Sequence, residues 1–223
     1  MKKHAIVAER QGSPKDAPGE RIPLALATGQ FVGAAASAVQ LPAAGPREVA
    51  FAGRSNAGKS SAINALAGRN RLAFTSRTPG RTQQINFFAL ASGAVVADLP
   101  GYGYAAVPRA LKEGWQSFLW QYVTLRDTLI GLVVVMDIRR GVLPLDLELL
   151  GGFVPSGRPV LVLATKCDKL NTTDKRKAVV AMRDSLQQEF PEQARNVSVV
   201  PFSATTREGV EQANRVLLDW LQT

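Results

Sequence analysis

The segment from Gly53 to Ser60, GRSNAGKS, constrains this chain more than any other stretch of its sequence. It matches G-x-x-x-x-G-K-[ST], a pattern in which glycines let backbone N–H groups approach a bound phosphate closely. In this pattern Lys59 reaches the β- and γ-phosphates of a nucleotide, and the Ser60 hydroxyl binds Mg²⁺. A helix that begins here would add a partial positive charge facing the phosphates.

The residues on both sides of this loop fit a phosphate site. Residues 48–52 form a short apolar run that predicts a buried strand, and residues 61–67 have apolar residues at helical spacing before Gly68, a predicted C-cap. A glycine-containing turn that matches by chance is disfavoured, because strand, loop and helix follow in the required order. The residues expected to contact nucleotide are Gly53, Arg54, Ser55, Asn56, Ala57, Gly58, Lys59, Ser60 and Ser61.

Composition narrows the class of protein. The 223 residues are 46% hydrophobic, which favours one globular domain with a substantial core. The net charge of +9 favours a polyanionic partner such as RNA over a merely soluble basic chain. The single cysteine, Cys167, excludes an internal disulfide and indicates a reducing compartment. The single histidine, His4, disfavours histidine-based acid–base chemistry in the core.

The start of the chain differs in character from the rest. Residues 1–22 are polar and rich in Pro and Gly, so we expect a flexible tail before a domain over 23–223. No secretory signal is expected after Met1, and no apolar run is long enough to span a membrane. Residues 24–40 are small and apolar, and they predict a short helix or an irregular segment packed on the domain edge.

A second phosphate-side signature follows a predicted hairpin. Residues 85–90 and 94–97 predict two strands joined by a short turn, hence an antiparallel pair. Asp98, Leu99, Pro100 and Gly101 then match D-x-x-G, in which the aspartate holds Mg²⁺ through water and the glycine N–H senses the γ-phosphate. Four residues alone are a weak signal, but this position downstream of Ser60 makes it strong.

The remaining elements alternate between strands and helices. This order predicts an α/β fold, a three-layer P-loop NTPase sandwich with about six mostly parallel strands and one antiparallel strand. The nucleotide is expected at the carboxyl ends of the strands. Either Thr172 or Thr173 is the expected cap of its helix. The predicted helices are 111–126, 144–153, 172–190 and 207–221, and the further strands are 129–136, 159–164 and 197–202.

A base-recognition signature follows the strand over 159–164. The sequence Thr165-Lys166-Cys167-Asp168 resembles [NT]-K-x-D, in which the carboxylate accepts hydrogen bonds from N1–H and the exocyclic amine of guanine. The Lys166 stem would lie over the base plane. A plain charged loop would be the better interpretation in isolation, but two other signatures precede it in order. The segment Ser203-Ala204-Thr205 resembles the S-A-x loop, whose backbone N–H groups contact guanine O6, and Phe202 just before it is included among the expected nucleotide contacts.

Together these segments resemble the TRAFAC GTPases and, more narrowly, the EngB/YihA/YsxC family of ribosome biogenesis GTP-binding proteins. The resemblance runs from about residue 24 to the C-terminus and rests on residues 48–67, 78–88, 98–105 and 165–168. It implies a first switch loop in which Thr82 binds Mg²⁺ beside Ser60 and Asp98. The further residues it places at the nucleotide are Gly80, Arg81, Gln83 and Gln84.

The family resemblance also implies partners and a location. It implies a bacterial cytoplasmic protein that acts in large ribosomal subunit assembly, through the subunit or its rRNA precursor, and in normal septation. The expected ligands are GTP, GDP and Mg²⁺. We expect a monomer with no membrane and no disulfide partner.

The expected reaction is GTP hydrolysis by water, with Lys59, Asn56, Thr82 and Gly101 as the catalytic residues. Ras-like GTPases place a water-orienting glutamine after D-x-x-G, where this chain has Tyr102, so intrinsic hydrolysis is expected to be slow. Asn56 resembles an asparagine that coordinates an activating K⁺ in related GTPases. Arg81 is the alternative activator, reaching the phosphates from the switch loop.

Two other classes of protein compete with this one. An ATP-using kinase or transport ATPase is disfavoured by Asp168 and by the single-domain length. A non-catalytic, nucleotide-dependent RNA or protein interaction module is disfavoured by the intact residues Lys59, Ser60, Thr82 and Asp98, although Tyr102 keeps it open.

Overall fold

The structure is a computed structural model of the chain and describes residues 24–43, 45–73, 84–103 and 109–222. The predicted tail, residues 1–22, lies outside the described residues, so that prediction is not tested. The described part contains a seven-stranded sheet in the order β1-β3-β4-β2-β5-β6-β7. The strands are β1 (Gln30–Ala35), β2 (Glu48–Gly53), β3 (Ile85–Ala89), β4 (Val95–Asp98), β5 (Leu129–Asp137), β6 (Val160–Thr165) and β7 (Val197–Pro201).

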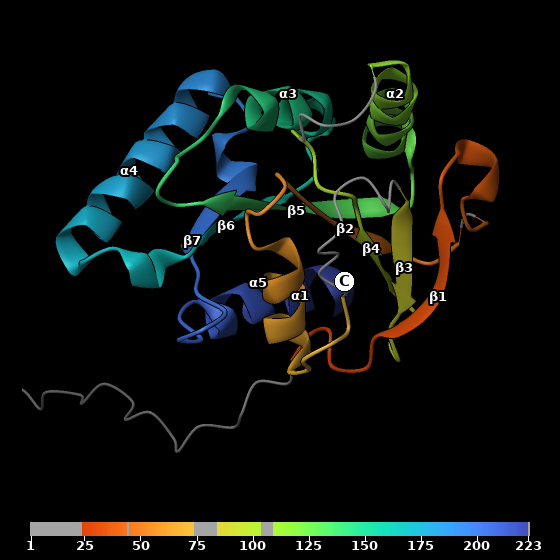
Figure 1. Ribbon diagram of the computed structural model, residues 1–223, viewed down its shortest axis with the longest axis horizontal. Helices are drawn as coiled ribbons and strands as arrows, with labels where there is room; N and C mark the ends of the chain where they lie inside the picture. Colours follow the sequence, from red (N-terminus) through yellow and green to blue (C-terminus); the bar gives the residue numbers. More distant parts are fainter. Residues whose placement is uncertain (1–23, 44, 74–83, 104–108, 223) are drawn as a thin grey trace, which may run out of the picture.

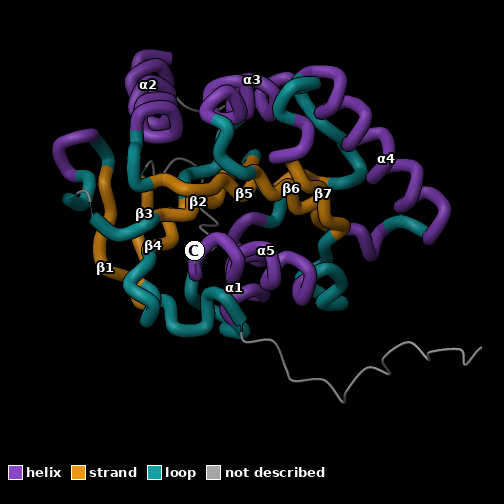
Figure 2. Tube along the Cα trace, turned by 180° about the vertical axis from the view of Figure 1, so that it is seen from behind, coloured by secondary structure: helices purple, strands orange, loops and turns teal. Residues whose placement is uncertain are grey.

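Helices cover both faces of the sheet, which gives three layers (Figure 1). They are α1 (Lys59–Ala67), α2 (Arg109–Leu125), α3 (Pro144–Phe153), α4 (Thr172–Glu189) and α5 (Val210–Gln222). Figure 2, the view from behind, shows α1 and α5 on one face and α2, α3 and α4 on the other. Two apolar cores result: Phe118, Tyr122 and Leu150 lie in one, and Ile63 and Leu217 lie in the other.

Strand direction places the carboxyl ends together. Strand β2 pairs in parallel with β4 and β5, and the parallel pairing continues through β6 to β7. Strand β3 pairs antiparallel with both β4 and β1, so it alone among the described strands runs against the others. Strands β2, β5 and β6 are buried at almost every residue, as expected for a parallel sheet covered on both faces. The loops after β2, β4, β5 and β6 therefore emerge at one edge.

The predicted fold class is confirmed, and two local predictions are wrong. Residues 30–35 form edge strand β1 instead of a helix or irregular segment, because their backbone pairs with β3 from Gln30↔Ala89 to Ala35↔Ile85. The cap of α4 is Asn171, whose side-chain oxygen accepts a 2.9 Å hydrogen bond from the Asp174 N–H. Thr172 is the first helical residue.

A buried ion pair fixes the opposite, amino edge of the sheet. Glu48 begins β2 and is 1% exposed. Its carboxylate accepts hydrogen bonds from Tyr122 Oη at 2.7 Å and Thr128 Oγ1 at 2.8 Å, and it pairs with Arg126. Burial and the nearby Glu48 carboxylate raise the pKa of Tyr122 well above its usual value. One carboxylate thereby joins β2, α2 and the start of β5.

Candidate functional site

The phosphate-loop sequence adopts the backbone that its glycines allow. A Cβ on Gly53 would lie 2.7 Å from the carbonyl oxygen of Val135, so β2 can approach β5 this closely only with glycine. Gly58 has a φ of 100°, and Asn56 has a φ of 65°. Helix α1 begins at Lys59, so its N-terminus faces the loop as expected.

A single hydroxyl ties this loop to the base-recognition segment. Thr165 Oγ1, at the end of β6, lies 2.5 Å from the Ala57 carbonyl and 2.9 Å from the Met136 carbonyl, within hydrogen-bond distance of both. Thr165 is 4% exposed, so water competes little for these contacts. The two segments, far apart in sequence, are therefore held in register.

Lys59 forms an ion pair with Asp98 in this structure. Asp98 ends β4 and is 5% exposed. Because an unpaired buried charge is costly, the ion pair with Lys59 stabilises the Asp98 carboxylate. Ser60 lies in the first turn of α1. Hydroxyl and carboxylate oxygens are the donors that Mg²⁺ prefers, so Ser60 and Asp98 have the right chemistry to hold it with nucleotide phosphates.

The loop after Asp98 lies against the phosphate loop. The Ser55 N–H donates to the Tyr102 carbonyl at 3.0 Å, and the Tyr102 N–H donates to the Gly53 carbonyl at 3.2 Å. A Cβ on Gly101 would lie 3.0 Å from Ser55 Oγ, so only glycine fits without displacement. The Tyr102 hydroxyl points to Asp146 of α3. Tyr102 therefore does not occupy the position of a water-orienting side chain in this structure.

The predicted base-recognition residues also lie together. Lys166 Nζ donates to the Asn56 carbonyl at 2.7 Å and pairs with Asp137 at 3.0 Å, which extends its stem along the site. Asp168 accepts a 2.7 Å hydrogen bond from Ser203 Oγ. This bond, with the ion pair to Lys169, lowers the pKa of Asp168 and keeps the carboxylate ionised as an acceptor.

The S-A-x loop offers fewer backbone N–H groups for guanine O6 than the sequence predicts. The Ser203 N–H already donates to the Glu208 carbonyl at 2.9 Å. Within the described residues the Ala204 N–H has no acceptor, so it remains available for a base oxygen. The Phe202 and Cys167 side chains are fully buried, so they position the backbone rather than contact a base.

The remaining predicted residues fall into two groups, those that the structure does not describe and those that it does. Gly80, Arg81, Thr82 and Gln83 fall outside the described residues, and Gln84 is exposed just before β3. The buried Leu99 packs in the core, and Pro100 is half-buried. The sequence interpretation missed Asp137 and Asp146 as carboxylates at the site. An acidic residue directly after the apolar run of β5 was the available signal for Asp137.

Loops from β2, β4, β6 and β7 converge at the carboxyl edge of a sheet with this topology, and that arrangement defines a P-loop GTPase. The family model described as 50S ribosome-binding GTPase matches residues 48–166, and the model of the elongation factor Tu GTP binding domain matches residues 114–223. The probable GTP-binding protein EngB of Dechloromonas aromatica is 50% identical over 86% of each chain. That of Azoarcus sp. is 50% identical over 81% of this chain and 85% of its own. The chain belongs to the EngB family of GTP-binding proteins.

Solved structures support the fold. A crystal structure of a probable GTP-binding protein engB has a TM-score of 0.61 at 21% identity, covering 78% of this chain and 98% of that one. Era in complex with MgGDPNP and a segment of 16S ribosomal RNA has a TM-score of 0.58 at 22% identity, covering 78% and 56%. Within the described residues, no helix is both long and apolar enough to cross a membrane.

Proposed function

We propose that this GTPase is a nucleotide-dependent switch in the assembly of the large ribosomal subunit in the bacterial cytoplasm, and that septation depends on it through that assembly. The observation that carries the proposal is the match of residues 48–166 to the model of 50S ribosome-binding GTPases. The net charge of +9 supports an RNA partner.

The switch would begin with the exchange of one ion pair. Lys59 pairs with Asp98 in the structure, and a bound nucleotide offers Lys59 its β- and γ-phosphates instead. Asp98 would then be free to hold Mg²⁺ through water, with Ser60 and Thr82 as the other proposed ligands. Mg²⁺, when bound with the nucleotide, neutralises charge on the phosphates. Gly101 is the proposed γ-phosphate sensor, because its loop is bonded to the phosphate loop.

Guanine selection would rest on Asp168, held by Ser203. Its two oxygens can accept from N1–H and the exocyclic amine of guanine, and adenine offers no such pair of donors. The Lys166 stem, fixed at Nζ by the Asn56 carbonyl, is the proposed cover of the base plane.

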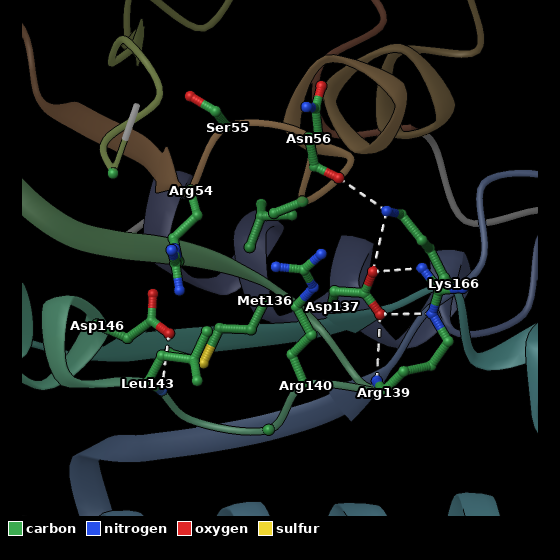
Figure 3. Close-up of a pocket in the computed structure, with 14 residues that line it drawn as sticks. Arg54, Ser55, Asn56, Met136, Asp137, Arg139, Arg140, Leu143, Asp146 and Lys166 are labelled. Atoms are coloured by element: carbon green, nitrogen blue, oxygen red, sulfur yellow. Dashed lines mark hydrogen bonds and ion pairs between the residues drawn. The ribbon is translucent and has the colours of Figure 1, made fainter. Parts of the chain in front are cut away.

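K⁺ is the proposed activator of hydrolysis. The Tyr102 hydroxyl is engaged by Asp146, so a different group must act on the phosphates. The Asn56 side chain is exposed on the phosphate loop and points away from Lys166 (Figure 3). GTPase rates measured in KCl and in NaCl at equal ionic strength test this, and equal rates would exclude it.

The switch is tested by co-sedimentation with large ribosomal subunits in the presence of a GTP analogue, GDP or no nucleotide. We expect the most protein in the pellet with the analogue, and Lys59→Ala should lose the difference between the three conditions. Equal sedimentation of the wild type in all three would contradict a nucleotide-dependent switch.

A second candidate function is a non-catalytic interaction module that binds nucleotide without turnover. The engagement of Tyr102 by Asp146 favours it, because the residue at the position of the water-orienting glutamine is held by a carboxylate. Measured phosphate release with and without ribosomal subunits separates the two. Turnover that subunits stimulate supports the switch, and no release in either condition supports the module.

A further inference from the structure

A hollow of about 450 Å³ lies beside the phosphate loop; it shares residues 54–57 and Lys166 with the predicted nucleotide contacts, and its remaining walls lie outside them. Its walls are residues 54–57, the end of β5 at 135–137, and the segment from Arg139 to Asp146 that leads into α3 (Figure 3). Residues 58–60, which lie at the N-terminus of α1 and face the predicted phosphate position, do not line it. The hollow therefore lies on the α3 side of the loop.

One carboxylate in the hollow is fully engaged by two cations. Asp137 accepts hydrogen bonds from Arg139 Nε at 2.9 Å and Nη2 at 2.6 Å, and it pairs with Lys166. Burial would raise the pKa of Asp137, but the bonds from Arg139 and Lys166 outweigh burial and lower it. Asp137 is therefore shared by these two cations and pairs with no further cation among the described residues.

The second carboxylate is engaged by neutral donors. Asp146 is 1% exposed and accepts from the Tyr102 hydroxyl at 2.6 Å and from the Leu143 N–H at 3.0 Å. Burial raises its pKa, although both donors and the nearby Arg54 oppose that effect. Asp146 attracts Arg54 at a distance but makes no ion pair with it.

Two guanidinium groups remain. Figure 3 shows Arg54 and Arg140 directed into the hollow, from the phosphate loop and from the segment after β5. Arg54 is half-buried and Arg140 is exposed. Neither makes a hydrogen bond or ion pair within the part of the chain that the structure describes. Two like charges directed into one hollow repel each other and are stabilised by an anion between them.

We propose that this hollow binds a phosphate group of RNA, with Arg140 and Arg54 as the donors. A guanidinium presents its N–H groups in a fork that matches phosphate oxygens, and phosphate contacts of this kind position a protein on nucleic acid. The volume is within the range of small-ligand sites, roughly 300–1,000 Å³. The net charge of +9 favours a polyanionic partner such as RNA. The choice of RNA rests on the proposed function, whereas the anion site itself does not.

The site adjoins the nucleotide loop through direct contacts. Lys166 bridges Asp137 in the hollow to the Asn56 carbonyl of the phosphate loop, and Arg54 belongs to that loop. A phosphate bound by Arg54 and Arg140 would therefore join RNA to the segment that senses the nucleotide.

The test measures binding of a labelled, unstructured single-stranded RNA to the full chain by fluorescence anisotropy across a salt series. Saturating GDP and Mg²⁺ keep RNA out of the nucleotide site. We expect Arg140→Ala to weaken binding about tenfold at low salt and to reduce the slope of log K against log salt by about 0.7, the value for one lost phosphate contact on a single strand. Arg54→Lys should lose less RNA affinity than Arg140→Ala, because lysine keeps the positive charge.

The matched control is Arg195→Ala. Arg195 is exposed like Arg140 but precedes β7, at the amino edge of the sheet opposite the hollow. We expect its affinity and salt slope to equal those of the wild type. Equal losses in the two variants would show a general charge effect and overturn the site. Thermal melting and GDP affinity establish folding, and Arg140→Lys, expected to lose binding partially, replaces Arg140→Ala if that variant does not fold.

A competition arm identifies the source of the phosphate. At constant ionic strength, inorganic phosphate should displace the RNA from the wild type more than chloride does, and should lose this advantage with Arg140→Ala. Saturable phosphate binding that needs Arg140, with RNA binding that does not, would assign a small phosphorylated compound and overturn the RNA proposal. If the RNA measurements come out as expected but sedimentation with ribosomal subunits does not depend on nucleotide, the proposed switch is refuted and the RNA site is not.

Discussion

The Tyr102 hydroxyl donates a 2.6 Å hydrogen bond to Oδ1 of Asp146 and so joins the loop after β4 to α3. Burial and the adjacent carboxylate raise the pKa of Tyr102 well above its usual value, so the hydroxyl keeps its proton. The backbone of Tyr102 is bonded to the phosphate loop on its other side. The position of Gly101 is thus fixed between two elements.

Tyr102→Phe removes this bond while keeping the ring. The buried Asp146 then loses one of its two donors, which should cost about 1–3 kcal/mol in free energy of unfolding. Because Gly101 is less firmly placed, we expect kcat for GTP to fall about tenfold with GDP affinity retained. Urea unfolding and single-turnover kinetics measure the two effects.

Tyr122→Phe is the matched control for this variant. Tyr122 also donates to a buried carboxylate, Glu48, but at the amino edge of the sheet. Its loss should reduce stability by a similar amount and leave kcat unchanged. If both variants reduce kcat equally, Tyr102 has only a structural role.

The hydrogen bond from Ser203 to Asp168 predicts how guanine affinity can be changed without loss of selectivity. Ser203→Ala leaves the carboxylate in place but less well oriented, so we expect GTP and GDP affinity to fall about tenfold with the preference for GTP over ATP retained. Asp168→Asn should abolish that preference, because an amide cannot accept both guanine bonds. Competition of each nucleotide against labelled GDP measures both variants. Unchanged affinity in Ser203→Ala would show that the bond does not orient Asp168.

The ion pair of Glu48 with Arg126 should contribute strongly to stability because it is buried. Glu48→Gln leaves the mostly buried Arg126 guanidinium without its counter-charge, and we expect a loss of about 3–5 kcal/mol in the free energy of unfolding. The exposed Glu211–Arg215 pair of α5 provides the comparison, and Glu211→Gln should change stability by less than about 0.5 kcal/mol. Similar losses in the two variants would contradict the role of burial.

The buried thiol of Cys167 predicts a stability change at alkaline pH. Burial, together with the nearby Glu208, raises the pKa of Cys167 from its ordinary value of 9.0 to about 11. Below pH 9 this contribution is fully present. As pH rises from 9 towards 11, the unfolded chain loses the proton first, so unfolding becomes easier by up to about 1.4 kcal/mol per pH unit.

Urea unfolding of the wild type and of Cys167→Ala across this pH range separates the contribution of the thiol from those of the lysines and tyrosines that titrate at similar pH. We expect the difference in free energy of unfolding between the two proteins to shrink as pH rises. A constant difference would mean that the folded thiol ionises as readily as the unfolded one.

The sequence by itself determined the features that depend on neighbouring residues. The helix over residues 144–153 was predicted with its observed bounds, and Gly68 ends α1 with a φ of 63° as a left-handed C-cap. The order of strand, phosphate loop and helix at residues 48–67 was likewise readable, because periodicity and glycine placement act within a few residues. The prediction of about six strands with one reversed is met by β2 to β7, and the seventh strand, β1, was not predicted.

Only the tertiary structure decided what depends on distant segments. Strand β1 exists because Gln30 pairs with Ala89 of β3, and its own small, apolar residues have no period that indicates a strand. The contact of Tyr102 with Asp146, and the pairing of Asp137 with Lys166, join residues that the chain keeps far apart. The local sequence pattern determines the helices and strands. The partner of a buried charge is decided only when these elements pack, because leaving a charge unpaired is costly only after it has been buried.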